Sequence, residues 1–184
     1  MISFPACGDA GLQTDFVRLV DPLRFPAGGL TQDSVAEIRR VKARVDAERL
    51  PRAADPATHT KLGPGGLADV EWTVQLLQLR HGDAVPALRT TRTLAALRAA
   101  EAAGLVSAGD ALVLSEAWRL ATRVRNAIVL VRGRPSDSLP RAVRERAGVA
   151  YVCGYGAGEA ERLVDDYRRT TRRASAVIDR LFWA

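Results

Sequence analysis

From residue 61 to residue 80 the chain reads Lys-Leu-Gly-Pro-Gly-Gly-Leu-Ala-Asp-Val-Glu-Trp-Thr-Val-Gln-Leu-Leu-Gln-Leu-Arg, and these residues carry the clearest structural signal in the chain. A Gly- and Pro-rich loop leads into a run whose apolar residues recur at helical spacing. Two apolar stripes lie on opposite sides of this helix: Val70, Val74 and Leu77 on one side, and Trp72, Leu76 and Leu79 on the other. Such a helix packs on both flanks, so we predict a central helix over residues 67–81, ended by Gly82.

The sequence on either side of this stretch also predicts helices. Leu12, Phe16 and Leu19 have helical spacing, and Pro22 is expected to close that first helix. Thr31 can cap the second helix, whose apolar stripe is Val35, Ile38, Val41 and Val45. Ser107 can cap the long helix that begins near residue 108, and Gly133 is expected to end it. The predicted helices cover approximately residues 12–21, 32–50, 67–81, 92–103, 108–132, 140–153 and 159–182. Residues 51–66 hold three Pro and three Gly and are predicted to form a loop. We therefore predict an all-α fold, a bundle of about seven helices with one Gly/Pro-rich loop at 51–66.

Length and composition limit the kind of protein. The chain has 184 residues, which suits one domain, and we divide it into an N-terminal helix and turn (1–30) and a helical domain (31–184). The hydrophobic fraction of 47% and the charged fraction of 26% are ordinary for a globular chain. No apolar run reaches the roughly 18–20 residues of a membrane helix, and the first residues lack the layout of a signal peptide. We expect a cytoplasmic protein without a membrane partner.

The formal charge of +6 raises the question of nucleic acid, which also attracts basic proteins. Arg outnumbers Lys 25 to 2, the arginines are spread along the chain, and many stand near Asp or Glu. We interpret the charge as solvated helix faces and expect no nucleic-acid partner. With Cys7 and Cys153 far apart, and His59 and His81 without a Cys nearby, we expect no metal site and reduced thiols.

The loop and the start of the central helix invite two chemical interpretations that the residues argue against. Free backbone N–H groups at a helix start attract phosphate, but Asp69 and Glu71 would repel it and the spacing fails the P-loop pattern. Asp69 and Glu71 form a D-x-E pair that could hold a metal on a strand. On a helix their side chains point about 200° apart, so joint binding of one ion is not expected.

A polar stripe on the central helix leaves two interpretations open. Glu71, Gln75 and Gln78 lie on one narrow side between the two apolar stripes. Glu71 could pair with an Arg of a neighbouring helix, which is a structural role. The stripe could instead face a cleft and position a ligand.

The same stretch carries a family resemblance. Its pattern, Lys61-Leu62-Gly-x-Gly-Gly-Leu-x-Asp-Val-Glu-Trp-x-x-Gln-x-x-Gln-Leu, resembles the signature of the glutamine synthetase adenylyltransferase family. More closely, it is similar to the helical domain that follows each nucleotidyltransferase domain there and is shared with PII uridylyltransferase. Further segments extend the resemblance over most of residues 15–184: Arg39 to Leu50, Arg123-x-x-Asn126, Leu139-Pro140, and the ending from Tyr167 to Trp183.

The resemblance implies a function that this chain would not perform alone. The family transfers AMP from ATP, with magnesium, to a tyrosine of glutamine synthetase, and a related domain removes it. The Gly-Ser turn and spaced acidic residues that this needs do not precede Met1, so the resemblance implies an inactive C-terminal fragment without catalytic residues. Its expected partners are the upstream nucleotidyltransferase domain, glutamine synthetase and a PII-type signal protein.

The resemblance also implies which residues would line or brace the nucleotide cleft: Lys61, Gly65, Gly66, Asp69, Glu71, Gln75, Arg123 and Asn126. The alternative is a pure interaction module that docks glutamine synthetase or a PII-type regulator. The location of the loop and of the Glu71 stripe distinguishes the two: a groove favours the cleft role, and burial against other helices favours docking by other surfaces.

Overall fold

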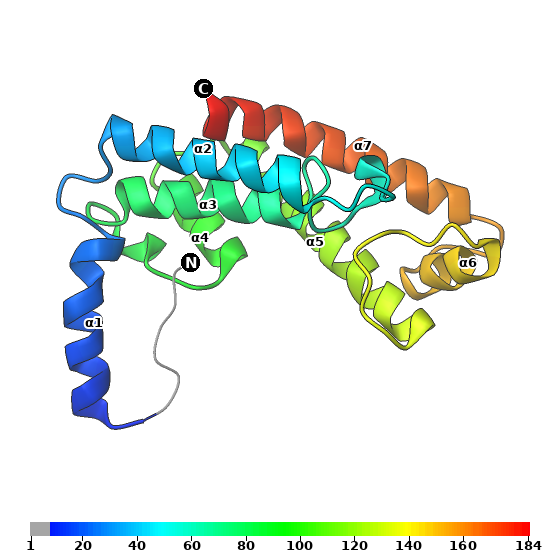
Figure 1. The fold of residues 1–184 in the computed structure, drawn as a ribbon, viewed down its shortest axis with the longest axis horizontal. Helices are drawn as coiled ribbons and strands as arrows, with labels where there is room; N and C mark the ends of the chain where they lie inside the picture. The colour runs from blue at the N-terminus through cyan, green and yellow to red at the C-terminus, as the bar shows by residue number, and fades with distance from the viewer. Residues whose placement is uncertain (1–7) are drawn as a thin grey trace.

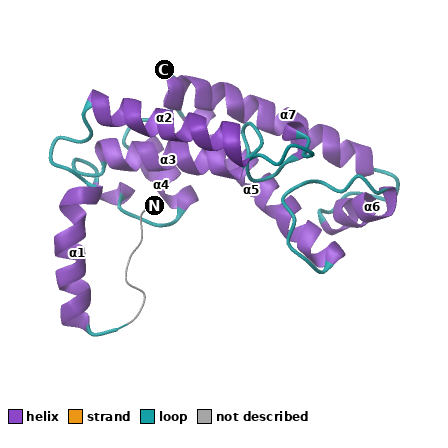
Figure 2. Ribbon diagram, viewed as in Figure 1, coloured by secondary structure: helices purple, strands orange, loops and turns teal. Residues whose placement is uncertain are grey.

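A computed structural model describes residues 8–184, which fold into helices joined by loops (Figures 1 and 2). The α-helices are α1 (Ala10–Arg24), α2 (Gln32–Arg49), α3 (Leu67–His81), α4 (Thr93–Ala102), α5 (Ala108–Arg132), α6 (Val143–Val152) and α7 (Ala160–Ile178). Two short 3-10 turns, η1 (Pro56–Thr58) and η2 (Pro86–Leu88), and a final π-helical turn, η3 (Asp179–Trp183), complete them. The predicted all-α fold of seven helices is confirmed for the described residues.

The core consists of two clusters that share the helices α3, α5 and α7. The first gathers side chains from α2, α3, α4, η2, η3 and the adjoining parts of α5 and α7. The second lies between the remaining halves of α5 and α7 and the short α6, and Leu67 reaches it from the start of α3. Trp118 of α5 packs against both clusters. The prediction that α3 is central is confirmed, because α3 packs against α4, α5 and α7.

The helix ends follow the local signals of the sequence. Thr31 and Ser107 accept hydrogen bonds from the backbone N–H groups of Ser34 and Asp110, as N-cap residues do. Gly133 ends α5 in the left-handed conformation, with φ +67°. These contacts are local, which is why the sequence predicts them.

Three local predictions were wrong. Pro22 lies inside α1, which continues to Arg24, because a proline near a helix end removes only one backbone bond. Val41, expected on the inner side of α2, is 41% exposed, and Lys42 is buried instead. Helix α6 begins at Val143 rather than near Pro140, because the preceding residue, Leu139, donates its backbone N–H to the carbonyl of Thr58.

The loop 51–66 is anchored at its middle to the segment between α5 and α6. His59 and Ser138 form an isolated antiparallel bridge, and Thr60 donates from both its N–H and its hydroxyl to the Asp137 carbonyl. Arg125 of α5 holds Asp137 by an ion pair of 2.6 Å. The loop 51–66 and the segment around Leu139-Pro140 lie far apart in the chain, and these contacts join them directly.

Helix α1 stands apart from the rest of the molecule (Figure 1). None of its residues is buried, and it makes no extensive contact with another helix of the described chain. No helix within residues 8–184 combines the length and apolar character needed to cross a membrane. The division at residue 30 stays a prediction, and residues 1–7, which include Cys7, lie outside the described residues.

Candidate functional site

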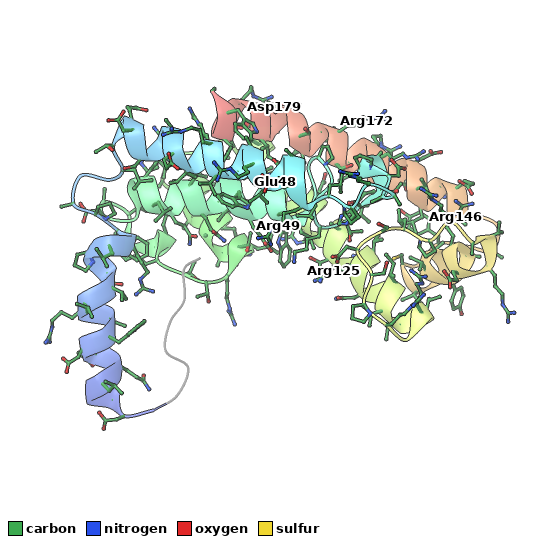
Figure 3. All side chains as sticks on the ribbon, viewed as in Figure 1. Glu48, Arg49, Arg125, Arg146, Arg172 and Asp179 are labelled. Atoms are coloured by element: carbon green, nitrogen blue, oxygen red, sulfur yellow. The ribbon has the colours of Figure 1, made fainter. Side chains whose placement is uncertain are left out.

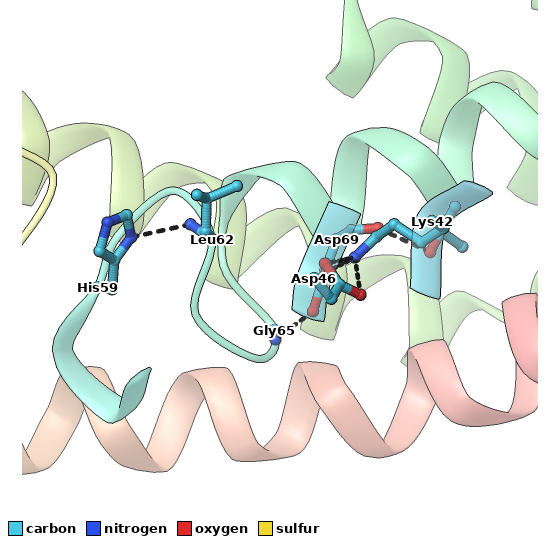
Figure 4. A network of polar contacts seen from close by, with 7 residues as sticks. Lys42, Asp46, His59, Leu62, Gly65 and Asp69 are labelled. Carbon is cyan, nitrogen blue, oxygen red and sulfur yellow. Dashed lines mark hydrogen bonds and ion pairs between the residues drawn. The ribbon is translucent and has the colours of Figure 1, made fainter. Parts of the chain in front are cut away.

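A cluster of ion pairs around the buried Lys42 connects the Gly-rich loop to two helices (Figure 4). The ammonium of Lys42, a side chain that is 3% exposed, contacts both carboxylate oxygens of Asp46 at 2.5 and 2.6 Å. It also contacts Asp69 Oδ1 at 2.5 Å. The other oxygen of Asp69 accepts the backbone N–H of Gly65 at 2.8 Å. Asp69 therefore joins α2, α3 and the loop, and its carboxylate is fully engaged within the protein.

The glycines of the loop are required by close packing. Gly65 has φ +69°, and a Cβ placed there would lie 2.0 Å from the carbonyl oxygen of Thr171 in α7. At Gly66 a Cβ would lie 2.8 Å from the Gly63 carbonyl oxygen and 2.9 Å from that of Thr60. The space beside these glycines is filled by this chain's own backbone. At both positions a residue with a side chain would therefore force the neighbouring backbone to move.

The start of α3 offers no free row of N–H groups to an anion. The N–H of Gly65 donates to Asp69, and that of Gly66 donates to Gly63. Leu67 and Ala68 donate to the carbonyls of Thr60 and Lys61. Since four consecutive donors are already bound, the geometry argues against a phosphate cradle, as the sequence also indicated.

His59 stabilises the same loop from its other side. Its Nδ1 accepts the backbone N–H of Leu62 at 3.0 Å, and the residue is 4% exposed (Figure 4). Burial lowers the pKa of the imidazole, Lys61 lowers it further, and Asp137 opposes them. The neutral ring is the form that can accept this hydrogen bond.

The polar stripe of α3 borders a small hollow rather than an open cleft. The hollow has a volume of about 30 Å³ and is lined by the stripe and by three threonines: Glu71, Gln75, Gln78, Thr90, Thr91 and Thr93, with Val74. Gln78 is buried and donates to the carbonyls of Leu88 and Thr90 at 2.6 and 2.7 Å. Glu71 accepts the indole N–H of Trp118 at 3.5 Å, where an Arg partner was one expectation. The volume suits about one water molecule.

A larger groove of about 410 Å³ runs between the outer side of the loop and α7. The loop lines it with Pro56, Ala57 and Pro64, and on the opposite side lie Arg172 of α7 and Asp179 at the start of η3 (Figure 3). None of the candidate residues from the sequence lines this groove. Among residues 8–184 no three His, Cys, Asp or Glu side chains gather in a way that could hold a metal ion.

Comparison of the sequence with known protein families assigns the chain to one of them. The family model described as GlnD PII-uridylyltransferase matches residues 36–182. The chain belongs to this family.

Several curated relatives carry the same name, "Bifunctional glutamine synthetase adenylyltransferase/adenylyl-removing enzyme". The protein from Streptomyces coelicolor is 59% identical over 177 residues, and that from Streptomyces avermitilis is 61% identical over 176, each match covering 96% of this chain. The protein from Mycolicibacterium smegmatis is 57% identical over 175 residues, or 95% of the chain. Each match covers 18% of the relative, so this chain spans about a fifth of their length.

Within this domain of the GlnD PII-uridylyltransferase family, the sequence candidates divide into separate groups. One group lies at the loop, where Gly65 donates its N–H to Asp69 and Gly66 packs closely against the backbone. A second group, Glu71 and Gln75, lines the small hollow. Lys61 is exposed, and its carbonyl accepts the N–H of Ala68.

Arg123 and Asn126 are exposed on α5 and are not brought to the Glu71 hollow. They lie roughly 7.5 and 12 Å further along the helix axis than Trp118, at 1.5 Å per residue. Arg123 instead lies near the buried thiol of Cys153, whose pKa is raised by burial and lowered in part by Arg123.

Sequence reasoning missed Lys42, Asp46 and Trp118 as members of these groups. A signal for Lys42 was present, because it stands seven residues after Val35 and four after Ile38, on the inner side of α2. Charged side chains are seldom buried unless paired, so a Lys at such a position indicates an acidic partner.

Proposed function

We propose that the chain is the C-terminal helical domain of a bifunctional enzyme that adenylylates and deadenylylates glutamine synthetase. The likeness of nearly the whole chain to about a fifth of the relatives named for that activity carries the proposal. The parent enzyme would take AMP from ATP with magnesium and work in the cytoplasm. Its catalytic residues would lie in a nucleotidyltransferase domain upstream of this one.

In this proposal the domain supports the nucleotide cleft and contributes no reacting group. The ion-pair cluster of Lys42, Asp46 and Asp69 supports such a role, because together with the close packing of Gly65 it holds the loop between α2 and α7. Both positively charged candidates, Lys61 and Arg123, are exposed, and Lys61 lies on the loop itself, where its side chain is accessible to an anionic neighbour. Lys61, Glu71 and Gln75 are the residues we assign to the side facing the catalytic domain.

The experiment that tests this function compares AMP transfer by two proteins. Purified residues 1–184 and the longer polypeptide that includes the nucleotidyltransferase domain are tested separately. Each is incubated with magnesium, glutamine synthetase and ATP that is radiolabelled on the α-phosphate, which AMP carries with it. We expect label on glutamine synthetase with the longer polypeptide and none with residues 1–184. Labelling by the 184-residue chain would refute the supporting role, and its absence with both proteins would refute the enzyme assignment.

A substitution at Glu71 separates support of the cleft from support of the fold. In the longer polypeptide we expect Glu71→Ala to reduce AMP transfer by at least tenfold while Tm falls by only about 2–4 °C, as for the loss of one hydrogen bond. Leu112→Ala, on an exposed side chain of α5, is the control for unspecific effects. If activity falls only where the protein unfolds, Glu71 is a structural residue.

The second candidate is an interaction module that docks glutamine synthetase or a PII-type regulator without aiding catalysis. The burial of the loop glycines and of Gln78 favours it, because those residues then act within the domain. Surface plasmon resonance of immobilised residues 1–184 with glutamine synthetase, and separately with a PII protein, tests it. Saturable binding together with normal activity of Glu71→Ala would favour docking over the cleft role.

A further inference from the structure

Helix α1 carries an apolar side that nothing in the described chain covers. Its large apolar side chains stand at spacings of four, three and four residues and are largely exposed: Leu12 by 70%, Phe16 by 43%, Leu19 by 72% and Leu23 by 78%. This spacing places them on one side of the helix. An isolated helix of 15 residues is marginal in water, so such a side normally packs against a partner.

The base of α1 is held too firmly for the helix to turn back onto the bundle. Phe25, directly after α1, is 4% exposed. The guanidinium groups of Arg24 and Arg89 stack over its ring, with their Cζ atoms 5.8 and 5.0 Å from the ring centroid. Gly82 contacts Phe25 so closely that a Cβ would lie 2.4 Å from the ring.

The turn after Phe25 is fixed to the end of α3 as well. The N–H of Gly28 donates to Asp83 Oδ2 at 3.0 Å, and Gly29 lies against the Arg80 carbonyl, where a Cβ would be 2.2 Å from the oxygen. Helix α1 therefore leaves the bundle in a fixed direction (Figure 1). Its large apolar side chains are exposed to solvent.

The charges of α1 exclude two kinds of partner. Between Ala10 and Arg24 the helix has two Asp and two Arg, and these pair on the helix as Asp15 with Arg18 and Asp21 with Arg24. A helix that binds a lipid surface carries a cationic polar side, and one that binds a charged protein carries a net charge. Helix α1 has neither, so the partner must offer an apolar surface.

A second copy of this chain offers too little area. A specific interface buries about 800 Å² on each partner, whereas a whole aromatic residue buries only about 150–250 Å². Because Leu12, Phe16, Leu19 and Leu23 are each exposed by only 43–78%, together they offer roughly 400–650 Å². The stripe also spans about two heptads, where a coiled coil needs about three or four. A weak apolar contact of this size becomes stable when the partner is tethered, because the effective concentration is then in the millimolar range.

We propose that the apolar side of α1 docks on the nucleotidyltransferase domain that precedes this helical domain in the longer polypeptide, an inference that rests on the proposed function. The position of α1 agrees with this partner, because the helix precedes the segment that matches the family model, residues 36–182. The docking surface consists of Leu12, Phe16, Leu19 and Leu23.

Amide hydrogen exchange tests the docking directly. We expect residues 10–24 to exchange at least ~100-fold more slowly in the longer polypeptide than in residues 1–184. Leu19→Gln/Leu23→Gln should abolish that protection, and in residues 1–184 it should leave Tm unchanged to within about 2 °C. The matched control is Leu130→Gln, whose side chain on α5 is 73% exposed, and which should affect neither measurement.

The alternatives give different results in the same experiment. Equal, fast exchange of residues 10–24 in both proteins would overturn the proposal. Protection in residues 1–184 that rises with concentration, together with a dimeric mass in sedimentation, would replace it with a pairing between copies. AMP transfer is measured on the same longer polypeptide: protection of α1 without transfer refutes only the enzyme assignment, and transfer without protection refutes only the docking.

Discussion

Gly65 is the residue whose lack of a side chain the fold requires most clearly. Its φ of +69° resembles the φ of +67° at Gly133, but Gly133 has no atom within 4 Å of its would-be Cβ. At Gly65 that Cβ would lie 2.0 Å from the Thr171 carbonyl oxygen. The two glycines therefore separate the cost of the left-handed backbone from the cost of the close approach.

We expect Gly133→Ala to lower the free energy of unfolding by about 1–2 kcal/mol, the cost of the left-handed conformation. Gly65→Ala should cost about 3–5 kcal/mol, because it also forces the loop away from α7. Urea denaturation followed by circular dichroism at 222 nm measures both. Equal losses would mean that the loop shifts freely and that the contact with Thr171 contributes little.

His59 makes the stability of the loop depend on pH. Burial lowers the pKa of its imidazole in the folded chain below the unfolded value of about 6.5. The unfolded chain therefore binds more protons in this range, and the stability is present above pH 6.5 and is lost as the pH falls through the folded pKa. Protonation would also place a hydrogen on Nδ1, which now accepts the N–H of Leu62.

We expect the free energy of unfolding to decrease between pH 7 and pH 5, with a slope of at most about 1.4 kcal/mol per pH unit from this group. In His59→Asn the side-chain oxygen can still accept from Leu62, but it does not titrate. His81, whose pKa is also lowered by burial, remains as the internal control. Urea titrations at several pH values should show a smaller slope for His59→Asn, and an unchanged slope would assign the dependence to other groups.

At the scale of elements, α2 is held to the bundle by a few specific contacts. Val35 enters the core, Lys42 binds Asp69, and Arg39 donates from Nε to the Phe182 carbonyl at 2.5 Å. The Arg39 guanidinium also donates to the carbonyl of Ala184. Because the outer side of α2 is polar, these contacts rather than broad apolar packing set its position.

We expect Arg39→Ala to speed amide exchange in residues 32–49 while exchange in α5 and α7 changes little. The loss in stability should be about 1.5–3 kcal/mol, as for hydrogen bonds from a charged group. Arg40→Ala is the matched control, because Arg40 is 72% exposed and pairs only with Glu37 on the same helix, which contributes at most about 0.5 kcal/mol. Uniform faster exchange throughout the chain would show that α2 does not open independently.

At the scale of the whole molecule, α5 and α7 run through both core clusters and connect them. Helix α5 has 25 residues and is therefore about 37 Å long. Trp118, partly buried on α5, packs against both clusters. Loss of packing in one cluster should therefore reach the other through these two helices.

We expect the bundle from α2 to η3 to unfold in a single cooperative transition. Leu97→Ala in the first cluster and Leu163→Ala in the second should each lower the free energy of unfolding by about 2–5 kcal/mol. Both substitutions should lower the Tm of the same thermal transition. Leu112→Ala, on a side chain that is 56% exposed, should change it little. Scanning calorimetry with two separate transitions, each responding to only one variant, would contradict the coupling.

The helices could be predicted because the forces that place them act between neighbours along the chain. The stripe of α3, the caps Thr31 and Ser107, and the stop at Gly133 are confirmed. The errors occur where distant residues intervene. Leu139 pairs with Thr58 instead of starting a helix, and Lys42 replaces Val41 inside because two carboxylates face it.

The roles of the candidate residues depended less on neighbours along the chain than on contacts between distant elements. The sequence alone determined the helical bundle, the Gly-rich loop and the motif that marks the family. Only the tertiary structure decided that Asp69 clamps the loop, that Gly65 lies against α7 and that Glu71 meets an indole instead of an arginine. The physical reason is that helical periodicity reports which side of a helix is buried, whereas the partner of a buried polar group comes from another element, 27 residues away for Asp69 and 47 for Glu71.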